Sequence, residues 1–134
     1  MAGLLFWWRD DKVNVRIGSV KIEATVAGTE TERAKGMSGK VYVADNQGML
    51  FVFPHDAKWQ IWMKDMKVPI DIVWLDASKK VVSLRKNVPP SSYPGHFTPP
   101  ADARYVLEIA SGAAQKANIE LGVRAEFTVS RVTK

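Results

Sequence analysis

The chain has 134 residues, no cysteine, and 19 lysines and arginines against 14 aspartates and glutamates, which gives a net charge of +5. This length fits one domain with its own hydrophobic core, and the lack of cysteine excludes disulfides, thiolate zinc sites and cysteine nucleophiles. The basic charge favours anionic neighbours such as nucleic acid, lipid headgroups or envelope polymers, although a solvated basic surface is the simpler explanation.

An apolar arm opens the sequence. Residues 2–8 are apolar, end in the pair Trp7 and Trp8, and are followed at once by the charged residues 9–12. The stretch is too short to span a bilayer, which needs about 20 residues, but tryptophans beside charges are typical of the interfacial end of a membrane helix. We therefore expect residues 1–12 to be either the remnant of a membrane anchor or signal, with the protein outside the cytoplasm, or an arm that packs on the domain. A cytoplasmic location stays open.

The next segment predicts two strands and a short helix. Residues 13–27 alternate between apolar and polar side chains, as half-buried strands do, with a turn between them. Thr29 and Glu32 have the spacing of a helix capping box, and Gly36 is placed to end the helix. Glu32 and Arg33 could instead be functional, but capping and surface pairing already explain this pattern.

The rest of the chain predicts more strands than helices. Residues 48–53 form a continuous apolar run, as in a strand buried on both faces. Residues 89–103 hold five of the seven prolines, which indicates a long loop. A short helix is expected over residues 111–122. Further strands are predicted at residues 59–63, 70–76, 79–88, 104–110 and 123–132. About eight strands and two short helices predict that residues 13–134 form one mostly-β domain, an antiparallel β-sandwich or barrel.

Asp71 falls in an otherwise apolar row with Val73 and Leu75. An unpaired buried charge is very costly, so the carboxylate needs partners. We favour the hypothesis that Asp71 accepts hydrogen bonds from the turn amides between Lys64 and Lys67. The alternative is an ion pair between Asp71 and Lys64 at the mouth of a cleft.

Glu108 raises the same question on another predicted strand. If its row with Val106 faces inward, the carboxylate needs a cation. The candidates for that cation are Arg33, Lys64 and Arg104. If the row faces outward, Glu108 is an ordinary solvated glutamate, and composition favours this second interpretation.

Five blocks of the sequence resemble a known family. In chain order they read TERAKGMSGK, GMLFVF, IWMKDMKVPIDIVWLD, VVSLRKNVPP and YVLEIASGAAQKANIELG. They resemble the family called domain of unknown function 192 (DUF192) over roughly residues 20–130. The resemblance implies a compact, mostly-β domain, often preceded by a signal or membrane anchor, and it brings no biochemical activity. The matching motif positions are Glu32, Arg33, Gly36, Trp62, Met63, Lys64, Pro69, Asp71 and Glu108.

The chain departs from the family pattern at three places. Asp65 and Met66 follow the Trp-Met-Lys motif where the family usually has Asn-Thr, so a hydrogen-bonding role of that pair does not carry over. Residues 37–40 replace the usual Leu-Met-x-Arg. Ser91 and Ser92 stand near the place where many members have cysteines, so a redox role is not available here.

Our first functional hypothesis is a non-enzymatic, envelope-associated binding domain. Its site would join the turn after residue 62 to the proline-rich loop, because aromatic rings beside charged groups suit a glycan, a peptide or an anionic envelope polymer. The predicted ligand-binding residues are Trp62, Lys64, Asp71, Tyr93 and His96.

Two other classes of function stay open. In a hydrolase-type enzyme, Asp71 and Glu108 would form the acid/base pair, since glycoside hydrolysis uses two carboxyls about 5–10 Å apart. In a nucleic-acid-binding module, Lys58, Lys64 and Lys67 would bind phosphates beside tryptophans that stack on bases. The second alternative is weaker, because acidic residues are interleaved with these lysines.

No metal or cofactor is predicted. His55 and His96 are the only imidazoles, and neither belongs to a ligand-spaced motif. The residues for which we expect structural roles are Glu32, Arg33, Gly36 and Pro69.

Overall fold

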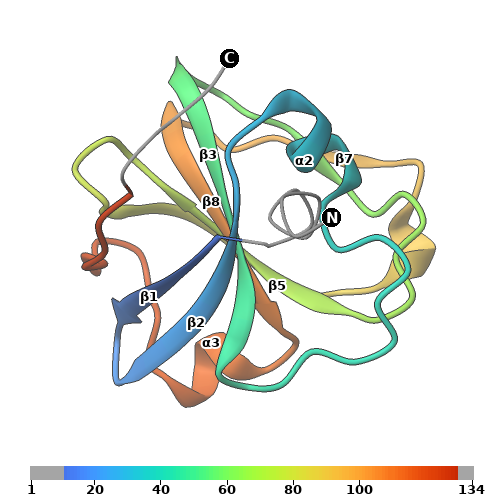
Figure 1. The fold of residues 1–134 in the computed structure, drawn as a ribbon, viewed down its shortest axis with the longest axis horizontal. Helices are drawn as coiled ribbons and strands as arrows, with labels where there is room; N and C mark the ends of the chain where they lie inside the picture. Colours follow the sequence, from blue (N-terminus) through green and yellow to red (C-terminus); the bar gives the residue numbers. More distant parts are fainter. Residues whose placement is uncertain (1–10, 130–134) are drawn as a thin grey trace, which may run out of the picture.

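The computed structural model describes residues 11–129, which form eight strands, two short α-helices and one 3-10 turn (Figure 1). The strands are β1 (Lys12–Ile17), β2 (Val20–Ala27), β3 (Gln47–Ala57), β4 (Ile61–Trp62), β5 (Ile70–Leu75), β6 (Val81–Val88), β7 (His96–Phe97) and β8 (Ala103–Ala110). The helical elements are α2 (Glu30–Lys35), η2 (Pro90–Ser92) and α3 (Ala113–Lys116). The mostly-β prediction, with about eight strands and two short helices, is confirmed.

Six strands form one mixed sheet in the order β1-β2-β3-β8-β5-β6, and β4 and β7 form a separate pair. All neighbours in the large sheet are antiparallel except β2 and β3, which are parallel. The purely antiparallel prediction therefore needs a correction. A parallel pair requires a crossover connection, and residues 28–46, which include α2, supply it.

The C-terminal segment approaches both edges of the large sheet. Glu126 forms an isolated bridge with Arg16 of β1, and Arg124 forms another with Lys80 just before β6. The predicted strand over residues 123–132 is thus reduced to bridges within its described part, although Ala125 and Phe127 are buried as its alternation predicts. Isolated bridges do not close the sheet into a barrel.

Two hydrophobic cores cover the two faces of the sheet. The first core contains residues of α3, the alternate β5 residues Val73 and Leu75, and Ile109 of β8. The second core contains the other β5 row, with Ile72 and Trp74, together with segments next to α2. The sides of the sheet that these two cores cover are here called the α3 face and the α2 face. In Figure 1 the two helices lie on opposite sides of the molecule. The central strands are therefore buried on both faces, as the long apolar runs predict.

The β1–β2 turn carries a glycine for two reasons. Gly18 has a φ of +58°, in the left-handed region that favours glycine. A Cβ at this position would lie 2.0 Å from the carbonyl oxygen of Ala117, at the end of α3. The next residue, Ser19, donates its amide to the same oxygen at 2.9 Å. This contact fixes α3 against the edge of the sheet.

Two predicted segments differ from the structure. The strand predicted at residues 59–63 is only β4, because its partner is β7, a short strand inside the segment 89–103 that was predicted as loop. Of the predicted arm over residues 1–12, all but the last two residues lie outside the described residues, and Lys12 begins β1. None of the helices within residues 11–129 has the length and apolar character needed to cross a membrane.

Candidate functional site

Helix α2 begins with the predicted capping box. The Thr29 side chain accepts a hydrogen bond from the Glu32 amide at 3.1 Å, and the Glu32 carboxylate accepts from the Thr29 amide at 3.1 Å. The same carboxylate accepts from the Gly28 amide at 3.0 Å. Gly36 ends the helix, so the sequence placed both helix ends correctly.

Arg33 attaches α2 to the large sheet. Its Nη1 atom donates to the carbonyl oxygens of Gly28 at 3.0 Å and Val52 at 2.9 Å. Its guanidinium carbon lies 5.3 Å from the centre of the Phe53 ring, in a cation–π contact. Arg33 is therefore held by backbone carbonyls and an aromatic ring, and it pairs with no carboxylate within residues 11–129.

A cavity of about 890 Å³ opens beside α2 on the α2 face. Its size lies within the range of roughly 300–1,000 Å³ that is usual for small-molecule sites. Much of its lining is aromatic or apolar, from β3, β4 and the segments that flank β4: Phe51, Phe53, Trp59, Ile61, Trp62 and Met66. Arg33, Lys64 and Glu108 bring charged or polar groups to the same lining.

Glu108 is the buried carboxyl of this cavity. It lies on β8 between Met49 of β3 and Ile72 of β5, and only 4% of the residue is exposed. The expectation of a solvated glutamate is wrong, because β8 is a central strand covered on both faces. Burial raises the pKa of the Glu108 carboxyl to about 8, so the group is mostly neutral at pH 7.

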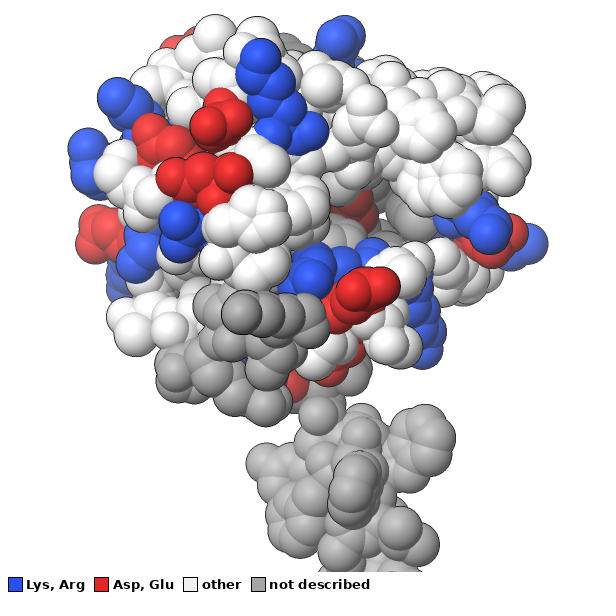
Figure 2. All heavy atoms as spheres, turned by 90° about the horizontal axis from the view of Figure 1, so that it is seen from above, with Lys and Arg blue, Asp and Glu red and all other residues white. Residues whose placement is uncertain are grey.

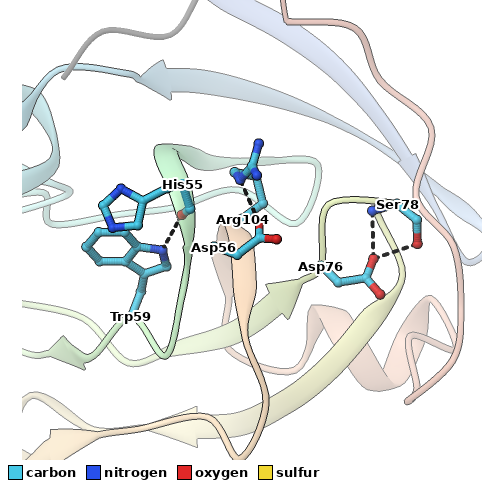
Figure 3. A network of polar contacts seen from close by, with 6 residues as sticks. All are labelled: His55, Asp56, Trp59, Asp76, Ser78 and Arg104. Carbon is cyan, nitrogen blue, oxygen red and sulfur yellow. Dashed lines mark hydrogen bonds and ion pairs between the residues drawn. The ribbon is translucent and has the colours of Figure 1, made fainter.

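None of the cations suggested by the sequence pairs with Glu108. Arg104 instead binds Asp56 at 2.7 Å, as Figure 3 shows. The same view shows the indole nitrogen of Trp59 donating to the carbonyl oxygen of His55 at 3.1 Å. This bond fixes the Trp59 ring, which stacks on Phe53 with the ring centres 4.2 Å apart.

An aromatic cluster lies at the edge of the cavity and consists of Trp62, Tyr93 and His96. Pairing of β4 with β7 places Trp62 directly opposite His96, and the two rings stack with centres 4.9 Å apart. The Tyr93 ring lies 5.3 Å from that of Trp62, and the Lys64 Nζ atom lies 5.6 Å from the Trp62 ring centre. Trp62 and Tyr93 are 41% and 43% exposed. Four of the five predicted ligand-binding residues are thus brought together.

Asp71 is the fifth predicted residue, and it lies elsewhere. It is fully buried and accepts hydrogen bonds from the amides of Asn87 at 2.8 Å, Gly112 at 3.1 Å and Ala114 at 2.9 Å. These amides belong to the end of β6 and the start of α3. The prediction that Asp71 accepts hydrogen bonds from the turn at residues 64–67 is therefore wrong. Asp71 acts as the cap of α3, whose own N-cap residue has no side chain.

The proposed acid/base pair does not form one site. Ile72 pairs directly with Glu108, and Asp71 pairs directly with Ile109. Directly opposed residues of antiparallel strands point to the same face, so Asp71 and Glu108 point to opposite faces. The carboxylate-pair hydrolase therefore lacks the geometry that it requires.

The turn before β5 is held through its backbone carbonyl groups. The carbonyl oxygen of Asp65 accepts from the Gly39 amide at 3.0 Å, and that of Lys64 accepts from the Ser38 hydroxyl at 3.4 Å. Pro69 stands directly before β5, a position where the missing amide proton is tolerated. The turn thus presents Lys64 to the cavity while the loop after α2 supports it.

Comparison with known proteins places the chain in a family. The family model described as uncharacterized ACR, DUF192, matches residues 13–127. The chain belongs to the DUF192 family. It is 30% identical over 120 residues to a UPF0127 protein of Thermococcus sibiricus (strain DSM 12597 / MM 739), with 88% of this chain and 71% of that protein covered.

Two solved structures share the fold of this DUF192 chain. A protein of Sinorhizobium meliloti 1021 described as a putative transcription regulator superposes with a TM-score of 0.84, at 23% identity, over 88% of this chain and 95% of its own. A protein of unknown function from Novosphingobium aromaticivorans DSM 12444 superposes with a TM-score of 0.79, at 25% identity, over 87% and 84%. At these identities the likeness shows the fold alone.

Sequence patterns did not reveal the cavity of this DUF192 domain. Part of its wall is built by Phe51 and Phe53, which belong to the run at residues 48–53 that was predicted as a buried strand. One pattern in the sequence could have indicated it: Phe51 and Phe53 are two positions apart in β3, so both rings point to the same face of the sheet. Figure 2 shows acidic and basic side chains next to one another over one face, which gives no continuous basic surface there for nucleic acid.

Proposed function

We propose that the protein is a non-enzymatic binding domain for a glycan, which stacks on the aromatic cluster and reaches into the cavity beside α2. The exposed Trp62 ring at the edge of the cavity is the observation that carries this proposal. Aromatic rings offer an apolar face to the C–H groups of a sugar, and nearby polar side chains bond to its hydroxyls. Gln60 and Lys64 supply such groups in the lining.

Preorganisation of the cluster supports the proposal. Trp62 is held by the β4–β7 pairing and by its stack on His96, so its ring loses little freedom when a ligand binds. Gln60 is also positioned, because its amide nitrogen donates to the Thr98 hydroxyl at 3.0 Å. A rigid aromatic face beside a cavity binds ligands at a low entropic cost.

The proposal includes a location at the cell envelope. The apolar residues 2–8 and the pair Trp7 and Trp8 support an anchor or signal at this end of the chain. Fractionation of cells that express the protein from its own gene tests this part. Recovery in the envelope or outside the cell is expected, and recovery in the soluble cytoplasmic fraction contradicts it.

The binding function is tested by calorimetric titration with a panel of envelope oligosaccharides. Trp62→Ala and Tyr93→Ala should each weaken binding roughly tenfold or more, as loss of a central aromatic contact does. Tyr42→Ala is the matched control, because Tyr42 is 74% exposed and lies outside the aromatic cluster. Unchanged affinity in folded Trp62→Ala, or failure of every saccharide to bind, contradicts the proposal.

A further inference from the structure

The Glu108 carboxyl is buried yet has no protein partner. Within residues 11–129 it takes part in no hydrogen bond and no ion pair, whereas buried carboxyls normally have several. Each described side-chain oxygen that is fully sealed from solvent has a hydrogen-bond partner. The Glu108 oxygens must therefore open onto the cavity that the residue lines.

The charged groups around Glu108 favour an anion. Besides Glu108, the charged or titratable side chains that face this cavity come from α2, β3 and the segment after β4: Glu30, Arg33, Lys35, His55 and Lys64. The row of β5 that packs against Glu108 is apolar, with Ile70, Ile72 and Trp74. Besides Glu108, the lining thus holds three cationic side chains and one acidic side chain, that of Glu30. A protonated Glu108 adds no negative charge to this set.

Arg33 has donors available for such an anion. Its two hydrogen bonds to protein both use Nη1, and within the described part of the chain Nε and Nη2 donate to no protein acceptor. A guanidinium with free donors suits a carboxylate, because two of its N–H groups match the two carboxylate oxygens.

We propose that the glycan is acidic, and that Glu108 and Arg33 together bind the carboxylate of the sugar inside the cavity. This inference rests on the proposed binding function and adds the class of ligand. The Glu108 hydroxyl donates to one oxygen of the sugar carboxylate, while the Arg33 guanidinium supplies the opposite charge. The aromatic cluster then stacks on the neighbouring sugar ring.

The inference predicts a definite pH dependence of binding. Sugar carboxylates are ionised above about pH 5, and Glu108 keeps its proton up to about pH 8. Above pH 8 the carboxylates of Glu108 and of the sugar would face each other, so Glu108 must take up one proton for each ligand that binds. Affinity should therefore fall about tenfold between pH 7 and pH 9. A cationic amine as ligand would give the opposite trend, because it needs ionised Glu108.

The test compares acidic saccharides with their own methyl esters by calorimetry. Oligogalacturonates and the disaccharide of N-acetylglucosamine and N-acetylmuramic acid serve as probes, since methyl esterification removes the charge and adds only one methyl group. The free acids should bind roughly tenfold or more tightly than the esters at pH 6.5. Glu108→Gln keeps a hydrogen-bond donor but does not titrate, so it should bind the acids at pH 6.5 and lose the fall between pH 7 and 9.

Each other outcome overturns a specific claim. Equal affinity for acids and esters rejects the acidic ligand but leaves glycan binding intact. Affinity that rises with pH, or a pH dependence that persists in folded Glu108→Gln, rejects the role of Glu108. Lack of binding by every acid, ester and neutral saccharide rejects the proposed function and this inference together.

Discussion

Asp71 and Glu108 lie on adjacent strands, one position out of register, and their side chains leave the sheet on opposite faces. The Asp71 carboxylate accepts hydrogen bonds from three backbone amides. The Glu108 carboxyl lines a cavity and has no hydrogen-bond partner within residues 11–129. Although both carboxyls lie in apolar stretches of the sequence, the described part of the backbone binds only that of Asp71. Asp71 contributes to stability by capping α3, whereas Glu108 is mostly neutral at pH 7 and remains available to a ligand.

Asp71→Asn should destabilise the protein by about 3 kcal/mol. The two carboxylate oxygens accept from different amides, and the Asn side chain has only one acceptor oxygen, so its NH2 group would face at least one backbone N–H group that loses its partner. Urea unfolding at pH 7 measures the loss. Asp45→Asn is the control, because Asp45 forms an exposed ion pair with Lys116 that should contribute little. A loss below about 1 kcal/mol in Asp71→Asn would show that these hydrogen bonds do not hold α3.

The separation of two contacting residues along the sequence decides whether the contact could be predicted. The capping box joins Thr29 to Glu32, three residues away, and the contact of Trp62 with Lys64 joins residues two positions apart that the sequence placed in one site. Both were predicted. Asp71 instead bonds to residues 16, 41 and 43 positions away, which no local pattern contains.

The orientation of Glu108 was beyond the sequence for another reason. In β8 the rows of Leu107 and Val106 are both buried, one in each core. A strand buried on both faces has no alternation to mark an inward side, so a solvated position could not be distinguished from a cavity. The pairing of β4 with β7, which brings His96 to Trp62, was equally hidden, because the partner strand lies in a proline-rich segment.

Glu108 should make the protein less stable as the pH rises. The pKa of its carboxyl is about 8 in the folded state, against an ordinary value of 4.5 in the unfolded chain. Between these values the folded state binds more protons, so the free energy of unfolding falls by at most about 1.4 kcal/mol per pH unit. The stabilisation is complete below pH 4.5 and is lost as the pH passes 8.

Urea unfolding at a series of pH values checks this sign. Glu108→Gln does not titrate, so its stability relative to the unchanged protein should increase from pH 5 to pH 8. Glu120→Gln, at an exposed position, should follow the unchanged protein throughout. Parallel curves for Glu108→Gln and the unchanged protein would mean that the Glu108 carboxyl is already ionised in the folded state at pH 5.

Thr29→Ala should cost about 1 kcal/mol, because the side chain that caps α2 is lost and the Glu32 amide has no acceptor. Urea unfolding gives the total loss, and amide exchange shows whether it is local to α2. Thr31→Ala is the matched control, since Thr31 is exposed within the helix and alanine has the higher helix propensity. An equal effect of the two substitutions would show that the capping box is not stabilising.

Gly18→Ala should destabilise the protein by about 3 kcal/mol or more. The new Cβ would lie 2.0 Å from the Ala117 carbonyl oxygen, so the end of α3 must move away from the β1–β2 turn. Gly39→Ala is the control for backbone conformation alone, because Gly39 also has positive φ, +80°, but nothing lies within 4 Å of its Cβ position. That variant should lose about 1 kcal/mol. Thermal or urea unfolding of both variants separates the two effects, and equal losses would mean that α3 yields at no cost and that the contact between Gly18 and Ala117 does not fix it.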